Sequence, residues 1–240
     1  MVYLGSKIHI AKYIIPIIQN LIDYYNVETY VEPFVGGCNV IDKIHAPIRI
    51  GNDKNKYLIE MFRNLDKLDT FPLDLSKEEY DVCKRCAKND DGSREAWYIG
   101  AVGSLYSYFG KIWGGGYCLK VRDDRNYVSE HYRNRLSQKE NLLTVDFRCE
   151  DYRNLNIPNG SVVYCDPPYR DTYKYFGMED FNSDDFWEWV RIISKDNYVI
   201  TSEVVAPDDF KAIWQKTDNR GKFKERNEKL FAYRGGLYVP

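Results

Sequence analysis

The sequence is poor in the features that mark several large classes of protein. Its 240 residues include only three histidines, which lie far apart and form no metal-binding motif. No apolar run approaches the ~20 residues of a membrane-spanning helix, and the first residues lack the apolar core and cleavage site of a signal peptide. These absences disfavour histidine-based or metal-based catalysis, secretion and a membrane location, and they predict a cytoplasmic protein.

The six cysteines do not form a recognisable framework. Several stand in apolar runs, which is typical of reduced, buried thiols in a cytoplasmic protein. Cys83 and Cys86 have the spacing of half a zinc site, but Cys118 and His131 do not supply a second close pair. We therefore predict no metal, with zinc as the weaker interpretation.

Charge is nearly balanced over the whole chain, with a formal net charge of −2. Its distribution is uneven, because residues 84–148 contain 12 Lys and Arg but only 8 Asp and Glu. A basic segment on an otherwise acidic protein favours a local contact with an anionic partner such as nucleic acid.

Short apolar strands alternate with helical patterns, which predicts a parallel α/β sheet. The predicted strands are Thr29–Pro33, Ile48–Asp53, Leu142–Asp151, Ser161–Asp166 and Asn197–Glu203, with a closing strand pair within Lys224–Arg234. The predicted helices of this part are Lys7–Tyr25, Val40–Ala46, Asn55–Asp66, Asp184–Ser194 and Pro207–Gln215. Pro16 lies inside the first helix and should break or kink it.

Residues 70–140 depart from this alternation. They contain helical patterns near Lys77–Ala87, Arg94–Tyr106 and Val128–Leu136, around the glycine-rich and aromatic stretch SYFGKIWGGGYCLKV. We therefore predict a sheet domain formed by residues 1–69 and 141–240, interrupted by a mainly helical insertion of residues 70–140.

The first strand runs into a glycine turn, Glu32-Pro33-Phe34-Val35-Gly36-Gly37. Glycine lets the backbone approach a ligand closely, and Asp53 ends the second strand where a carboxylate commonly accepts both hydroxyls of a ribose. Asp53 also suits a helix N-cap, which is the simpler interpretation. The chain lacks G-x-G-x-x-G and a phosphate-loop lysine, which disfavours a nicotinamide enzyme and favours an adenosine ligand without phosphates.

The strand SVVYC ends abruptly at Asp166-Pro167-Pro168-Tyr169. Two prolines stop the strand and stiffen the loop, so Asp166 stands at the sheet edge where ligands bind. The Asp166 carboxylate and the Pro167 carbonyl can each accept one N–H of an exocyclic aromatic amine, directing its lone pair at an electrophile. Tyr169 can stack on the ring that carries this amine.

The motifs, in the order in which they occur along the chain, resemble those of the Dam-like, alpha-group DNA adenine-N6 methyltransferases. The resemblance covers nearly the whole chain. Tyr3-Leu4-Gly5-Ser6-Lys7 is similar to the amino-terminal cofactor motif of that family, and Asp166 to Tyr169 is similar to its catalytic motif. The insertion occupies the place of its target-recognition region. The chain departs from the family at Cys38, where a third glycine is frequent, and its insertion is compact.

The resemblance implies a Rossmann-like, S-adenosylmethionine-dependent methyltransferase fold with an inserted target-recognition subdomain, acting on double-stranded DNA. The cofactor residues that it implies are Tyr3, Lys7, Glu32, Pro33, Phe34, Gly36, Gly37, Asp53, Asp151, Tyr152 and Asp166. The catalytic residues are Asp166, Pro167, Pro168 and Tyr169. Candidates for DNA contacts are Lys111, Lys120, Arg122 and Arg125, which suit an ordinary solvated loop equally well.

Other functions stay open from the sequence. The same motif is compatible with N4-methylation of cytosine, with methylation of an amine in RNA or protein, and with a non-catalytic DNA-binding subunit that keeps the fold. A restriction endonuclease counterpart, a phage role or a regulatory role is equally compatible, and the oligomeric state is undetermined.

Overall fold

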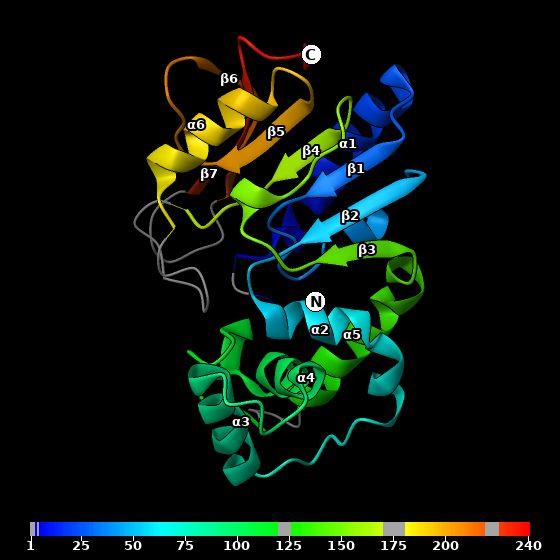
Figure 1. Cartoon of the computed structure of the whole chain (residues 1–240), viewed down its shortest axis with the longest axis vertical. Coiled ribbons are helices and arrows are strands. Elements are labelled where there is room, and N and C mark those ends of the chain that lie inside the picture. Colours follow the sequence, from blue (N-terminus) through cyan, green and yellow to red (C-terminus); the bar gives the residue numbers. More distant parts are fainter. Residues whose placement is uncertain (1–2, 4, 120–125, 170–180, 219–225) are drawn as a thin grey trace.

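The computed structural model describes residues 3, 5–119, 126–169, 181–218 and 226–240. It contains a seven-stranded sheet with the order β3-β2-β1-β4-β5-β7-β6 (Figure 1). The strands are β1 (Thr29–Glu32), β2 (Ile48–Asn52), β3 (Val145–Arg148), β4 (Val162–Cys165), β5 (Tyr198–Glu203), β6 (Phe210–Asp218) and β7 (Arg226–Tyr233). Strands β1 to β5 are parallel to one another, and β7 runs antiparallel between β5 and β6.

The strand order creates a switch point between β1 and β4. From β1 the chain continues outward through β2 and β3 on one side, and it returns to start β4 on the other side of β1. Connections leave the carboxyl ends of β1 and β4 in opposite directions, which opens a crevice at that edge of the sheet. Glu32 and Asp166, at or just beyond these two strand ends, therefore lie at the position where doubly wound sheets bind ligands.

Helices cover both faces of the sheet (Figure 1). The elements are α1 (Ala11–Tyr25), α2 (Lys56–Arg63), α3 (Lys77–Asn89), α4 (Ala96–Tyr106), α5 (Tyr127–Leu142) and α6 (Ser183–Ile193). Successive residues of the central strands point to opposite faces, so Tyr30 and Tyr164 pack in the core with α1, whereas Val31 and Cys165 pack in the core with α6. The central strands are thus buried on both sides.

The inserted helices pack directly on the sheet domain. A Cβ atom added to Gly100 of α4 would lie 1.9 Å from the carbonyl oxygen of Tyr57 in α2, so the two helices approach closely because Gly100 has no side chain. Helix α5 then leads straight back to β3 and crosses the predicted boundary at residue 141. The division into two domains stays a prediction.

The structure confirms five of the predicted strands and most of the helices. The closing strand pair expected within Lys224–Arg234 is only half right, because that range forms one strand, β7, whose partner is β6. Three further elements are corrected. The helix predicted at Pro207–Gln215 is wrong, because Phe210–Asp218 forms β6. Phe210, Ile213 and Trp214 have helix-like spacing, but a β-bulge between Ala212 and Trp214 inserts one extra residue into a strand paired with β7.

The other two corrections concern turns. Val40–Ala46 contains only a 3-10 turn at Ile41–Lys43, because Ile44 is already extended on the way to Pro47. The first helix begins at Ala11 after a separate 3-10 turn at Lys7–His9, and it runs unbroken through Pro16.

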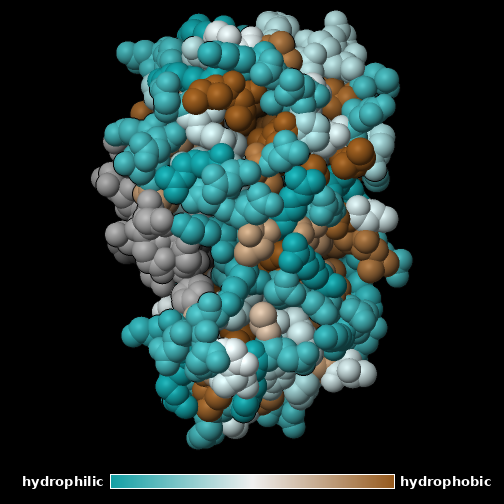
Figure 2. Space-filling view, viewed as in Figure 1, coloured by the Kyte–Doolittle hydropathy of each residue, from teal (hydrophilic) through white to brown (hydrophobic). Residues whose placement is uncertain are grey.

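Among the described residues, no helix is both long enough and apolar enough to cross a membrane. Hydrophilic residues cover most of the face shown in Figure 2, with smaller hydrophobic groups between them.

Candidate active site

The glycine turn after β1 is packed against the amino-terminal segment. A Cβ atom added to Gly37 would lie 2.9 Å from the Cβ of Tyr3, and Gly36 has a left-handed φ of 46°. Ser6 Oγ accepts a hydrogen bond of 2.8 Å from Asn39 Nδ2 just beyond the turn. The two sequence motifs expected to bind the cofactor are therefore in contact, and Gly37 is required because any side chain there would collide with Tyr3.

Asp53 holds the backbone of this turn. Its carboxylate accepts hydrogen bonds from Gly36 N at 3.1 Å and Asn55 N at 2.9 Å. Asn55, not Asp53, is the N-cap of α2, since its side chain accepts from Leu58 N. Burial raises the pKa of Asp53 to about 6, against the opposing effect of the two N–H donors. The carboxylate keeps lone pairs beyond these two bonds, so it can also accept hydroxyl groups.

Asn52 is a functional residue that the sequence reasoning missed. Its fully buried amide donates to the carbonyls of Pro33 and Glu150, each at 3.0 Å, and accepts from Glu150 N at 2.9 Å. Its backbone carbonyl accepts from Val35 N at 2.7 Å. One residue at the end of β2 thus fixes the loops that follow β1 and β3, which both line the candidate site.

A small pocket of about 20 Å³ lies between these loops. It is lined by Pro33, Phe34, Lys54, Glu150, Asp151, Tyr152, Arg153, Phe181 and Asn182. The rings of Phe34 and Tyr152 have centroids 5.1 Å apart, and Phe181 lies 6.0 Å from Phe34. The aromatic lining and polar rim have the chemistry of a site for a flat heterocycle, but side chains fill most of its volume.

Asp151 stands at the rim of this pocket. Arg153 donates to it from Nε at 2.8 Å and Nη2 at 2.7 Å, and these bonds lower the pKa of Asp151 to about 2. Lys54 Nζ lies 3.7 Å from the same carboxylate. Asp151 is therefore ionised at neutral pH and can act as a hydrogen-bond acceptor.

Asp166 lies at the tip of β4 beside two residues from distant parts of the chain. Lys7 Nζ is 2.7 Å from Asp166 Oδ1 and 4.4 Å from the centre of the Tyr169 ring. Tyr169 Oη donates to Glu228 Oε2 at 2.6 Å and lies 3.1 Å from Ser202 Oγ. The sequence analysis expected Lys7 to contact the cofactor, whereas the structure pairs it with the catalytic motif.

Burial has the largest effect on the pKa values of Asp166 and Glu32 at this edge of the sheet. It raises the pKa of Asp166 to about 6 although the Lys7 ammonium opposes the shift. It also raises the pKa of Glu32 well above its ordinary value, against the hydrogen bond of 2.7 Å that Tyr30 Oη donates to this side chain. Asp166 is therefore the ionised acceptor at the strand tip at neutral pH, and the buried Glu32 on the neighbouring strand has a raised pKa.

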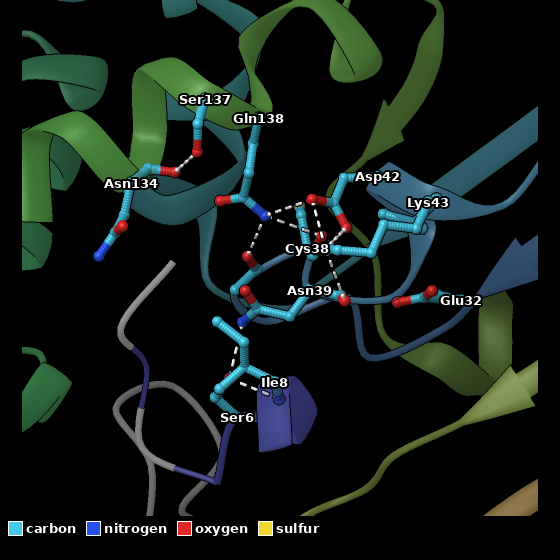
Figure 3. Close-up of polar contacts among 12 residues, drawn as sticks. Ser6, Ile8, Glu32, Cys38, Asn39, Asp42, Lys43, Asn134, Ser137 and Gln138 are labelled. Atoms are coloured by element: carbon cyan, nitrogen blue, oxygen red, sulfur yellow. Dashed lines mark hydrogen bonds and ion pairs between the residues drawn. The ribbon is translucent and has the colours of Figure 1, made fainter. Parts of the chain in front are cut away.

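Gln138 connects the inserted helices to the glycine turn (Figure 3). Its buried Nε2 lies 3.3 Å from the Gly37 carbonyl, 3.0 Å from the Cys38 carbonyl and 3.1 Å from Asp42 Oδ2. Cys38 has a left-handed φ of 55°, which costs energy for a residue with a side chain. Gln138 therefore supports the turn at the position where the family often has glycine.

The residues predicted to contact DNA are only partly described. Lys111 is half-buried in the turn after α4, and its carbonyl accepts from Gly114 N and Gly115 N. Lys120, Arg122 and Arg125 lie outside the described residues. The same turn exposes Tyr108 and Phe109, the latter with 65% of its surface accessible.

The sheet order and the helices on both faces define a Rossmann-like α/β fold. The family model described as D12 class N6 adenine-specific DNA methyltransferase matches residues 3–140, more than half of the chain. The protein belongs to that family.

Two curated relatives carry the names of methyltransferases. The chain is 25% identical over 212 residues to Type II methyltransferase M.FokI of Planomicrobium okeanokoites, covering 79% of the chain and 31% of that protein. It is 26% identical over 205 residues to modification methylase StsI of Streptococcus sanguinis, covering 75% of the chain and 31% of the relative. The chain thus spans about a third of the length of these relatives.

Two solved structures are similar over most of the chain. The putative methyltransferase yhhF from Escherichia coli has a TM-score of 0.36 and 8% identity, covering 92% of this chain and 85% of that one. The rRNA methyltransferase aviRa from Streptomyces viridochromogenes has a TM-score of 0.39 and 10% identity, covering 95% of this chain and 85% of that one.

Proposed function

We propose that this protein transfers a methyl group from S-adenosylmethionine to N6 of an adenine flipped out of double-stranded DNA. The observation that carries the proposal is the position of Asp166, at the tip of β4 beside the Tyr169 ring and across the switch point from the aromatic pocket. Family membership supports adenine as the target base.

The residues present fit the cofactor. Phe34 and Tyr152 would hold its adenine, Asp53 its ribose hydroxyls, and the Gly36–Gly37 turn would let the backbone approach it. S-adenosylmethionine, when bound, supplies an electrophilic methyl group on a sulfonium. The target adenine of the DNA has to leave the double helix, because its N6 is paired and shielded there.

The chain's own groups then orient the amine. Asp166 and the Pro167 carbonyl accept its two N–H groups, and Tyr169 stacks on the base. With the cofactor bound, attack of the N6 lone pair on the methyl carbon would leave the C–S electron pair on sulfur and a positive charge on N6, which would then lose one proton to water. The Asp166 carboxylate stabilises this positive charge, since a fixed charge beside a developing opposite charge lowers the barrier.

The partners are part of the same proposal. Double-stranded DNA is the proposed substrate, and a restriction endonuclease is the proposed functional counterpart, consistent with relatives named as a Type II methyltransferase and a modification methylase. A cytoplasmic location stays a prediction.

The function is tested by product identification. Purified protein is incubated with unmethylated duplex DNA and methyl-labelled S-adenosylmethionine, and nucleosides are separated by mass spectrometry, with the Asp166→Ala variant alongside. We expect labelled N6-methyladenine with the wild type and none with the variant. Label on cytosine would reject adenine as the target base, and bound cofactor with no labelled nucleoside would favour another substrate or a DNA-binding subunit.

Asp53→Ala should weaken cofactor binding by about a hundredfold. The variant removes an acceptor for the ribose hydroxyls, and hydrogen bonds to a charged group contribute about 1.5–3 kcal/mol each. It also releases the Gly36 N–H that shapes the turn. Isothermal titration with S-adenosylmethionine measures the change, and an affinity within about threefold of the wild type would contradict the assigned role.

Methyl transfer should depend on the ionisation of Asp166. With a pKa of about 6, the carboxylate loses its charge as the pH falls through that value. The single-turnover rate at saturating cofactor should therefore be constant above about pH 7 and fall about tenfold per pH unit below pH 6. A rate that is unchanged between pH 5 and pH 8 would show that the ionised Asp166 is not required.

A further inference from the structure

The Lys7 ammonium occupies an unusual position beside the catalytic motif. Only 7% of its side chain is exposed, and Nζ lies 2.7 Å from Asp166 Oδ1 and 4.4 Å above the Tyr169 ring. An N–H donor on the Asp166 carboxylate, positioned over the face of Tyr169, is also the arrangement that the substrate amine requires. The Lys7 ammonium and the N6 amine of a bound adenine therefore compete for one site.

Charge gives a second reason why Lys7 has to move. During methyl transfer, positive charge develops on N6 next to Asp166. A lysine ammonium within a few ångströms would repel this charge and oppose the reaction, because electrostatic interactions are strong at a buried site. Asp166 can stabilise the cation only when Lys7 no longer neutralises it.

Glu228 is the acid positioned to receive the lysine. Its Oε2 atom lies 4.0 Å from Lys7 Nζ, and only 13% of its side chain is exposed. Strand β7 is held between β5 and β6, and Tyr169 Oη donates to the same oxygen at 2.6 Å. Lys7 thus lies between two carboxylates, one at the reaction site and one on a fixed strand beside it.

We propose that Lys7 fills the amine site of the empty enzyme and moves from Asp166 to Glu228 when the target base enters, so that Glu228 is a positioning residue. This inference rests on the proposed function. The proposal predicts that replacing Glu228 slows methylation only when Lys7 is present. A purely structural role of Glu228 would slow methylation whether or not Lys7 is present.

The test compares Lys7→Met, Glu228→Gln and the double variant in the full chain. Glutamine keeps an oxygen that can accept from Tyr169 while it removes the charge, and methionine keeps most of the length of lysine without the ammonium. Single-turnover methylation is measured at saturating cofactor and at pH 8, where Asp166 is ionised. The duplex contains the mapped target site with 2-aminopurine next to the target adenine, so its fluorescence reports the loss of stacking when that adenine leaves the helix.

Glu228→Gln should slow methylation about tenfold and reduce the fluorescence change, because Lys7 then has no second carboxylate with which to pair. Lys7→Met should increase the fraction of flipped adenine. Adding Lys7→Met to Glu228→Gln should restore the rate to within about threefold of Lys7→Met alone. Melting temperatures and cofactor affinity of each variant verify that the fold is intact.

Additive losses in the double variant, or an unchanged rate in Glu228→Gln, would overturn the exchange. A loss of cofactor affinity in Lys7→Met without a change in base flipping would also overturn it and would return Lys7 to the cofactor site. In each of these cases the wild type still methylates adenine. The absence of N6-methyladenine with the wild type would instead reject the proposed function.

Discussion

Asp166→Asn is expected to slow methyl transfer by about a thousandfold while leaving the affinity for S-adenosylmethionine within about twofold of the wild type. Asparagine has nearly the same shape and keeps one oxygen acceptor, so the amine can still approach. It loses the negative charge that compensates the cation developing on N6, and its NH2 group can be turned toward the amine. Single-turnover rates and isothermal titration measure the two quantities separately.

Asp196→Asn is the matched control for this substitution. Asp196 is exposed in the turn before β5, at the opposite edge of the sheet from Asp166. Its variant should keep the wild-type rate. A rate for Asp166→Asn within about tenfold of the wild type would mean that the negative charge contributes little, and the proposed stabilisation of the cation would be wrong.

Asn52→Leu is expected to lower the free energy of unfolding by about 4 kcal/mol, because it leaves two carbonyls and one N–H buried without their partner. The affected groups belong to Pro33 and Glu150, which lie in the two loops that form the aromatic pocket. The remaining folded protein should therefore also bind the cofactor more weakly. Urea unfolding followed by far-ultraviolet circular dichroism, with and without S-adenosylmethionine, measures both effects.

Asn64→Leu provides the comparison for Asn52. Asn64 is half-buried at the end of α2, and its side chain donates to the Glu60 carbonyl at 2.9 Å. Its loss should cost about 1 kcal/mol. Equal effects of the two substitutions would show that Asn52 does not have a special role in fixing the two loops.

The central fold was predictable because its signals are local. The strands that end at Glu32, Asn52 and Cys165 are short apolar runs followed by glycine, an acid or two prolines, and each is confirmed within one residue at its carboxyl end. Strand β6 was not predictable in this way. Its bulge gives Phe210, Ile213 and Trp214 the spacing of a helix, and only pairing with β7 decides between the two structures.

The candidate site also contains residues that the local sequence predicts and one that it does not. Asp53, the glycine turn and the Asp166–Tyr169 motif follow strand ends, so their proximity follows from a parallel sheet. Glu228 lies in the charged stretch KERNEK, where nothing local shows that one acid faces inward. Its only signal is the alternation with Leu230, which is fully buried two residues later on the same face of β7.

The meeting of Lys7 and Glu228 beside Asp166 also has a consequence for protein synthesis. These two residues are separated by almost the whole described chain, and β7 takes its place between β5 and β6 only after β6 exists. A ribosome-bound chain that has produced Asp166 and Tyr169 still lacks the acid that accepts from Tyr169. Tyr169 therefore gains its hydrogen-bond acceptor on Glu228 only when β7 completes the sheet.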